Sequence, residues 1–312
     1  MMKIVFFGLG SIGRRHAEIL IEDFDHEIYA FRSGKNTEPN DLGVKELHTW
    51  QEVEKINPDA VFITNPTFMH IDTALKCAEL GAALFIEKPL DSSDEKLELL
   101  IEEIKRQSLT TYVAYNMRFN PIIEFLKEYL KNKKVSHVSV YNSSYLPDWR
   151  GGKDQINSYS AQKSQGGGVV LDLSHEFDYI DHLFGSIQEI KGIFDRAANV
   201  TRDAEDFLDA AVKTDKTYVN LHLDFLSRHT ERTIKIDCEK EYIFADLVSG
   251  KVEFYKSDEG VLTKHFKIDR NKVHKKQIEY FLKNINNFTM MNNVTDASIL
   301  FRKIIEFKGH AI

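Results

Sequence analysis

The chain has 312 residues and a formal net charge of −7, with 42% hydrophobic and 29% charged residues, a balance typical of a globular protein. Its length suffices for two domains, each with its own core. Lysine and arginine form no basic block, so the composition argues against nucleic acid or an anionic membrane as the main partner.

Apolar runs and cysteines narrow the class of protein further. The longest apolar runs, such as residues 60–64 and 82–86, are far too short to span a bilayer. Met1 leads straight into the first predicted strand, without the pattern of a secretory signal. Cys77 and Cys238 form no CxxC pair, so we predict neither a disulfide framework nor a zinc knuckle. We therefore expect a cytoplasmic protein.

The chain opens with a predicted strand over residues 3–7, a glycine turn and a helix over residues 14–21. In such a turn the first glycine permits a tight bend, the second lets a pyrophosphate approach, and the third lets helix and strand pack closely. The phosphates would lie at the helix N-terminus, which favours anions. The pattern predicts a dinucleotide site, the alternative being a glycine-rich turn without a ligand. Its residues are Gly8, Gly10, Ser11, Ile12 and Gly13.

The next strand, over residues 26–31, bears on which dinucleotide binds. An acidic residue at its end would hold the ribose 2′-hydroxyl of NAD, whereas an arginine accommodates the 2′-phosphate of NADP. Arg32, Ser33 and Lys35 stand there instead of an acid. The sequence thus favours NADP, with NAD as the alternative if this is a solvated basic turn and the acidic contact comes from elsewhere.

Strands and helices then alternate. Strands are predicted over residues 59–64, 82–86 and 111–114, and helices over residues 70–80 and 93–106. This alternation is typical of a doubly wound parallel sheet. Glu87 and Lys88 follow a strand, where such sheets bind ligands.

Past Pro121 a helix over residues 122–131 is followed by strand patterns typical of an antiparallel sheet. Residues 219, 221, 223 and 225 are apolar and alternate with polar ones, so one sheet face is apolar and the other mixed. A mixed face suits an oligomer interface, and equally plain exposure to solvent. The strands are predicted over residues 135–145, 187–194, 207–213, 218–226, 230–238, 242–247 and 251–255, and two final helices over residues 272–287 and 295–308.

With these motifs in view, the chain resembles the Gfo/Idh/MocA family of NAD(P)-dependent oxidoreductases over nearly its whole length. The resemblance rests on the runs 8–16, 65–66 with His70, 87–90 and 116–119, and on glycines 166–168 leading to Asp172 and His175. It implies an α/β Rossmann domain over residues 1–119 and an α+β domain with a large open, mainly antiparallel sheet over residues 120–312. That second domain would bind substrate and form a homodimer or homotetramer.

The resemblance also implies hydride transfer between a nicotinamide and a hydroxyl-bearing carbon of a sugar, nucleotide sugar or polyol. Further cofactor contacts are then expected from Thr64, Asn65, Pro66, His70, Glu87, Lys88 and Asn116. Substrate contacts are expected from Lys88, Arg118, Trp149, Arg150, Tyr159, Asp172 and His175. The alternative for these contacts is a flexible loop from Asp148 to Gln165 with scattered polar side chains.

Lys88 is the candidate for the proton transfer that accompanies hydride transfer. In a partly dry pocket beside a cationic nicotinamide its charged form is disfavoured, which moves its pKa toward the working pH. An ordinary surface lysine is the alternative. The family also suggests that the peptide between Lys88 and Pro89 is cis.

Asp172 and His175 form the second candidate pair. A predicted helix over residues 171–184 would place both on one face. His175 would relay protons or hydrogen-bond the reacting oxygen, and Asp172 would fix its tautomer or bind a neighbouring hydroxyl. The family pattern has the histidine four residues after the aspartate, where this chain has Glu176. We favour His175 because imidazole both donates and accepts a proton near neutral pH. A metal site at residues 175, 176, 178 and 182 is disfavoured, since HExxH is absent.

Two classes of function follow. The first is an NAD(P)-dependent oxidoreductase acting on a sugar or nucleotide sugar, in surface-glycan precursor metabolism. The alternative is a non-catalytic, cofactor-binding regulator or scaffold of the same fold, against which the presence of Lys88 weighs.

Overall fold

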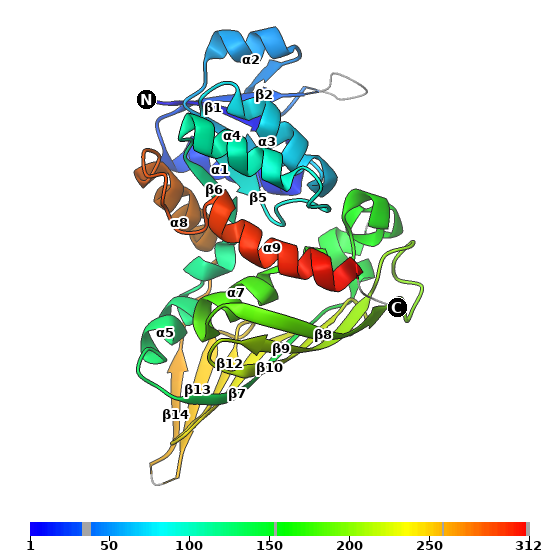
Figure 1. The fold of residues 1–312 in the computed structure, drawn as a ribbon, viewed down its shortest axis with the longest axis vertical. Helices are drawn as coiled ribbons and strands as arrows, with labels where there is room; N and C mark the ends of the chain where they lie inside the picture. Colours follow the sequence, from blue (N-terminus) through cyan, green and yellow to red (C-terminus); the bar gives the residue numbers. More distant parts are fainter. Residues whose placement is uncertain (33–38, 153–154, 258, 310–312) are drawn as a thin grey trace. The chain divides into compact units, whose positions relative to one another are not determined.

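The computed structural model describes residues 1–32, 39–152, 155–257 and 259–309, with side chains of 150–152 left aside. The chain forms two compact units (Figure 1). Unit 1 comprises Met1–Tyr115 and His274–Phe301, and unit 2 comprises Asn116–Val273 and Arg302–Ile312. Neither unit is one continuous stretch of sequence.

Unit 1 is built on a six-stranded sheet, sheet A, in which every neighbouring pair is parallel. Its order is β3-β2-β1-β4-β5-β6, so the chain reverses direction of winding between β1 and β4. The strands of the centre are buried apolar runs, as expected when helices cover both faces of a parallel sheet. This confirms the doubly wound prediction. The strands are β1 (Lys3–Phe7), β2 (Glu27–Phe31), β3 (Lys45–Leu47), β4 (Ala60–Ile63), β5 (Ala83–Glu87) and β6 (Thr111–Ala114).

Amphipathic helices cover sheet A. In α1, residues 13, 16, 17 and 20 are buried, the spacing of a single helical face. In α8, Phe281 is fully buried and its ring centroid lies 5.4 Å from that of Phe85 and 5.7 Å from that of Phe62. The helices of unit 1 are α1 (Ser11–Asp23), α2 (Trp50–Ile56), α3 (His70–Ala78) and α4 (Leu97–Gln107), with a 3₁₀ turn η1 (Thr67–Met69). Helix α8 (Arg270–Lys283) belongs to it from His274 onward, and α9 (Val294–Gly309) as far as Phe301.

Unit 2 is built on an eight-stranded sheet, sheet B, of order β14-β13-β12-β11-β7-β10-β9-β8. Every neighbouring pair is antiparallel except β7 with β10, which run parallel. This confirms the mainly antiparallel prediction and adds one strand to it, β14. The strands are β7 (Val135–Ser143), β8 (Ile187–Asp195), β9 (Phe207–Thr214), β10 (Tyr218–Asp224), β11 (Glu231–Cys238), β12 (Tyr242–Asp246), β13 (Lys251–Lys256) and β14 (Gly260–His265).

The two faces of sheet B differ as the alternation predicts. Val219, Leu221 and Leu223 are at most 2% exposed on the inner face. That face carries the helices α5 (Pro121–Tyr129), α6 (Val169–Asp172) and α7 (His175–Phe184). The outer face carries no helix among the described residues of unit 2, and a hollow of about 500 Å³ lies over its central strands. The segment between β7 and α6 forms the 3₁₀ turns η3 (Leu146–Gly152), η4 (Gln155–Asn157), η5 (Tyr159–Ala161) and η6 (Lys163–Gln165), and η2 (Asn116–Phe119) precedes α5.

Candidate active site

The glycine turn lies between β1 and α1, at the point where sheet A changes direction of winding. Gly8 has φ +107°, and a Cβ there would come within 2.7 Å of the backbone nitrogen of Asn65. A Cβ on Gly13 would come within 2.6 Å of Thr64 Oγ1, whereas one on Gly10 would meet nothing within 4 Å. Packing therefore requires glycine at positions 8 and 13, and the backbone at Gly10 is open to an approaching group.

The N-terminus of α1 has the donors that a phosphate needs. Gly10 is the N-cap and has no side chain to cap the helix, and the first bond to it comes from Arg14 N–H, 2.8 Å from Gly10 O. The N–H groups of Ser11, Ile12 and Gly13 thus precede the first intrahelical bond. Gly10 and Ser11 are exposed. The donor set and the open glycine fit the pyrophosphate of a dinucleotide.

The loop after β4 is tied to this turn. Thr64 Oγ1 donates to Gly8 O at 2.6 Å, and Thr64 N–H donates to Phe7 O at 2.9 Å. Asn65 Nδ2 donates to Thr73 Oγ1 at 2.8 Å. The structure thus brings Gly8, Gly13, Thr64 and Asn65 together, as the cofactor prediction requires, and Pro66 is exposed beside them.

His70 braces two loops of unit 1. Its ring is 2% exposed, and its two nitrogens lie 2.9 Å from the carbonyl oxygens of Asn65 and Pro89. The loops that follow β4 and β5 are therefore linked through one imidazole. This geometry assigns His70 a positioning role for Asn65 and for the residue pair 88–89.

Lys88 follows β5 directly, and the Lys88–Pro89 peptide is cis, as the resemblance suggested. Lys88 is half-buried, and its backbone N–H donates to Glu87 Oε2 at 3.2 Å. Glu87 Oε1 lies 2.7 Å from Nε2 of His16, a fully buried residue of α1. Glu87, which is predicted to contact the cofactor, is thus also fixed by a hydrogen bond with His16. This partner was not identified from the sequence.

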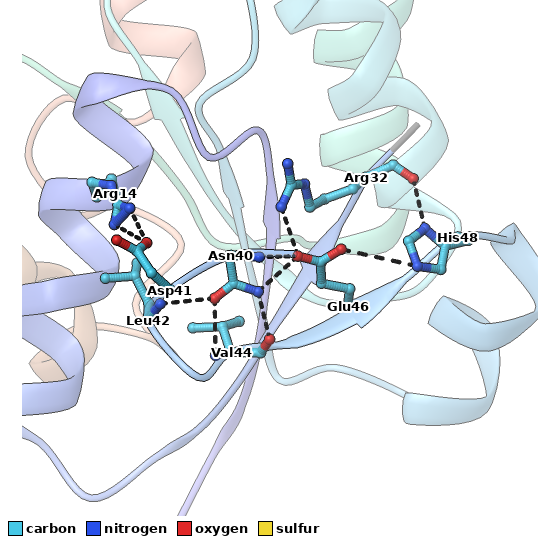
Figure 2. Close-up of polar contacts among 8 residues, drawn as sticks. All are labelled: Arg14, Arg32, Asn40, Asp41, Leu42, Val44, Glu46 and His48. Atoms are coloured by element: carbon cyan, nitrogen blue, oxygen red, sulfur yellow. Dashed lines mark hydrogen bonds and ion pairs between the residues drawn. The ribbon is translucent and has the colours of Figure 1, made fainter. Parts of the chain in front are cut away.

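Arg32, the basis of the NADP prediction, is paired within its own unit (Figure 2). Its Nη1 lies 2.6 Å from Oε1 of Glu46, a residue of β3. The other two residues of that prediction, Ser33 and Lys35, lie outside the described residues.

In unit 2, the predicted helix over residues 171–184 is two helices, so that part of the prediction is wrong. α6 ends at Asp172 and α7 begins at His175. The chain between them is wound more tightly, because Ser174 N–H donates to Leu171 O and Glu176 N–H to Leu173 O, both three residues back. Residues three apart lie above one another in such a turn, which places His175 on the side of Asp172.

Tyr159 and Asp172, both expected at the substrate, are in contact. Tyr159 Oη donates to Asp172 Oδ1 at 3.2 Å. Asp172 is 6% exposed, and Tyr159 and His175 are half-buried.

Glu176 points into the core of unit 2. Its side chain is fully buried, and its Oε1 accepts from Arg232 Nε at 2.7 Å and from Asn142 Nδ2 at 2.8 Å. Burial raises the pKa of Glu176, and the Arg232 guanidinium opposes that rise. Glu176 therefore holds α7 on sheet B, which leaves His175 as the histidine-role candidate.

The remaining predicted substrate residues have structural partners. Arg118 forms a bidentate ion pair with the buried Asp178, with Nη2–Oδ1 and Nε–Oδ2 distances of 2.7 and 3.0 Å. Trp149 Nε1 donates to Ser144 Oγ at 3.1 Å, and its ring packs on Phe225. The side chain of Arg150 lies outside the described part of the chain.

The described residues contain neither a metal cluster nor a membrane span. No group of three or more His, Cys, Asp and Glu side chains among them is placed to hold a metal ion. No described helix is long and apolar enough to cross a membrane.

Comparison with protein families matches both units. Residues 2–115 match the family described as "Oxidoreductase family, NAD-binding Rossmann fold" and residues 123–244 match the "GFO/IDH/MocA C-terminal domain". Among curated proteins, a myo-inositol 2-dehydrogenase of Thermotoga maritima is 28% identical over 200 residues, covering 62% of this chain and 57% of that protein. A levoglucosan dehydrogenase of Pseudarthrobacter phenanthrenivorans is 27% identical over 141 residues, covering 44% and 36%. The chain spans about half the length of the curated relatives it matches.

Solved structures share the fold over the whole chain. A levoglucosan dehydrogenase in complex with NADH has a TM-score of 0.85 at 15% identity, covering 99% of this chain and 98% of the other. A UDP-N-acetylglucosamine 3-dehydrogenase from Acidithiobacillus ferrooxidans has a TM-score of 0.81 at 18% identity, covering 99% and 97%. At these identities the likeness establishes a common fold.

Proposed function

Since this chain belongs to the Gfo/Idh/MocA family of oxidoreductases with an NAD-binding Rossmann fold, we propose that it transfers a hydride between nicotinamide and a hydroxyl-bearing carbon of a sugar or nucleotide sugar. The observation that carries the proposal is Lys88, placed directly after β5 in the unit that contains the open glycine turn. The chain is similar to inositol, levoglucosan and UDP-N-acetylglucosamine dehydrogenases, which supports this substrate class.

The chain's own residues have distinct roles in this proposal. A bound nicotinamide accepts or returns the hydride. Lys88 takes the hydroxyl proton during oxidation and returns it during reduction. His175 hydrogen-bonds the reacting oxygen or relays its proton, and Asp172 binds a neighbouring hydroxyl or orients the imidazole. The contact from Tyr159 supports the role of Asp172, because it holds one carboxylate oxygen in place.

Finer parts of the proposal rest on the sequence. The preference for NADP over NAD stays a prediction, and the pairing of Arg32 with Glu46 weighs against it. Action in the cytoplasm and in the synthesis of surface-glycan precursors also stays a prediction. Cys77 and Cys238 are free, which is compatible with a reducing compartment.

The first step of the experiment is independent of the identity of the substrate. NADPH and NADH are titrated separately into cofactor-free protein by calorimetry. Turnover is then measured with NAD⁺ and with NADP⁺ as hydride acceptor on a panel of inositols, levoglucosan and UDP-N-acetylglucosamine. We expect at least one dinucleotide to bind and at least one panel member to be oxidised, because the turn fits a pyrophosphate and Lys88 is in place. The regulator or scaffold would be favoured by a different outcome. In that case the chain binds a dinucleotide tightly, turns over no member of a broad sugar panel, and binds a partner protein only while the dinucleotide is bound.

We also propose that two or four copies associate through the outer face of sheet B. On this face Ile193 and Tyr218 are 65% and 61% exposed, and the hollow of about 500 Å³ is lined by side chains such as Tyr141, His222 and Lys235. Ile193, Asp209, His222 and Tyr141 stand in register across four strands, so apolar and polar side chains form one mixed surface. Such a surface suits a second copy of itself, because a two-fold axis places complementary groups opposite one another.

Asn220→Arg tests this association. Asn220 is exposed in the hollow, so a large cation there should convert the oligomer to a 36.1 kDa monomer without disturbing the inner core. Sedimentation velocity measures the mass, with Gln51→Arg on α2 as the matched control. A monomeric unsubstituted chain, or an oligomer that Asn220→Arg leaves intact, would contradict the interface.

A further inference from the structure

The end of β2 carries an arginine whose charge is already opposed within unit 1. Arg32 follows the last residue of β2, the position from which Rossmann folds contact the adenosine ribose. Its Nη1 lies 2.6 Å from Glu46 Oε1, and the two side chains are only 17% and 16% exposed. Glu46 comes from β3, where it stands in register with Ala30 of β2. A carboxylate absent from the end of β2 is thus supplied by the neighbouring strand.

Glu46 is fixed in this position by Asn40 (Figure 2). The same Oε1 accepts from the backbone N–H of Asn40 at 2.7 Å and from Asn40 Nδ2 at 2.8 Å. Asn40 is in turn held by Val44, whose N–H donates to Asn40 Oδ1 at 3.1 Å and whose carbonyl accepts from Nδ2 at 2.8 Å. The Asn40 side chain and backbone, followed by Arg32, lower the pKa of Glu46 to about 2. The carboxylate is therefore ionised at any physiological pH.

A second arginine near the turn is opposed in the same way. Arg14, in the first turn of α1, is paired with Asp41, the residue after Asn40 (Figure 2). The segment from 40 to 46 thus places one carboxylate on each of the two arginines. A 2′-phosphate adds about two negative charges at neutral pH, so it must compete with these carboxylates, whereas a ribose 2′-hydroxyl adds none.

We propose that Glu46 sets the dinucleotide selectivity of this protein by competing with the 2′-phosphate of NADP for Arg32. The inference rests on the proposed function, because it presupposes that a dinucleotide occupies the glycine turn. Glu46 also has a second oxygen, Oε2, which lies 4.0 Å from His48 Nε2. A carboxylate oxygen at this edge is the kind of acceptor that holds the 2′-hydroxyl of NAD. Glu46 therefore disfavours NADP through one oxygen and suits NAD through the other.

The test measures the Kd of NADPH and of NADH by calorimetry for the full chain and for Glu46→Gln. Glutamine keeps the size of the side chain and removes its charge. We expect the ratio of the NADPH Kd to the NADH Kd to fall by about tenfold, whichever dinucleotide the unsubstituted chain prefers, because Arg32 then pairs with the phosphate. Glu54→Gln, which removes an exposed charge from α2 of the same unit, is the control and should leave the ratio within about twofold.

A double-substitution cycle separates competition for Arg32 from a general effect of charge. In an Arg32→Gln background, Glu46→Gln should change the ratio by several-fold less than in the unsubstituted chain, since the contested cation is gone and only the acceptor for the ribose hydroxyl is lost. An unchanged ratio in Glu46→Gln, or an equal change in both backgrounds, would overturn the role of Glu46 while leaving the proposed function intact. Failure of the unsubstituted chain to bind either dinucleotide would overturn the proposed function and this inference with it.

Discussion

Replacing Lys88 by Met is expected to lower kcat by about 10²- to 10⁴-fold, the usual contribution of a general acid or base. Methionine keeps the length of the side chain and removes the proton-carrying nitrogen. The backbone bond from Lys88 N–H to Glu87 Oε2 and the brace of His70 on Pro89 do not use the lysine side chain, so the loop after β5 should keep its form. Dinucleotide affinity should therefore change by less than about threefold. Steady-state kinetics and calorimetry with the same protein give both quantities.

Lys96→Met is the matched control for that experiment. Lys96 belongs to the same unit and precedes α4, and its Nζ pairs with Asp72 Oδ1 at 2.7 Å on the surface. Its loss should leave kcat within about twofold. Turnover by Lys88→Met within tenfold of the unsubstituted chain would show that another group transfers the proton.

Replacing Glu176 by Ala is expected to lower the free energy of unfolding by about 3 kcal/mol, because it leaves the partly buried guanidinium of Arg232 without its carboxylate. The bond from Asn142 is lost as well. Urea unfolding followed by circular dichroism measures the change. Substitution of both partners, Glu176→Leu with Arg232→Leu, should recover part of the loss, since no charge then remains buried.

Glu231→Ala is the control, because this neighbour of Arg232 is exposed and its loss should cost less than about 0.5 kcal/mol. Activity of Glu176→Gln distinguishes the two candidates for the histidine role. If the variant stays folded and kcat holds within about threefold, the role belongs to His175. If stability is unchanged and kcat falls a hundredfold, Glu176 takes part in the chemistry and its assignment to the core is wrong.

The sequence was most informative where secondary structure repeats a pattern. The centre of sheet A was predictable because β1, β4 and β5 are buried apolar runs that end at a glycine turn, at Thr64-Asn65-Pro66 and at a charged pair, respectively. In β10 a strict alternation identified the inner face of sheet B. Two edge strands were missed because they lack such a pattern: all six residues of β14 are exposed, and β3 has only three residues.

Motifs located the parts of the site that are local, and missed the pairings that join distant parts of the chain. The glycine turn could be assigned from consecutive residues. The partner of Glu87 is His16, 71 positions away, and the partner of Arg32 is a residue of the next strand. The absence of an acid after β2 predicted NADP because the sequence does not reveal that Glu46 lies beside Arg32 in space. For the same reason the burial of Glu176 against Arg232 could not be foreseen.

The discontinuity of unit 1 has a consequence for the order in which the protein is made. Sheet A is complete once residue 114 has left the ribosome, but Phe281, which packs on Phe62 and Phe85, is still to be synthesised. At about 5–20 residues per second that interval lasts roughly 8 to 33 s. During this time Phe62 and Phe85 of the nascent sheet lack the helix α8 that packs on them. Expression of the first 115 residues alone would make that exposed state permanent, so a truncated cofactor-binding unit needs residues 274–301 supplied as well.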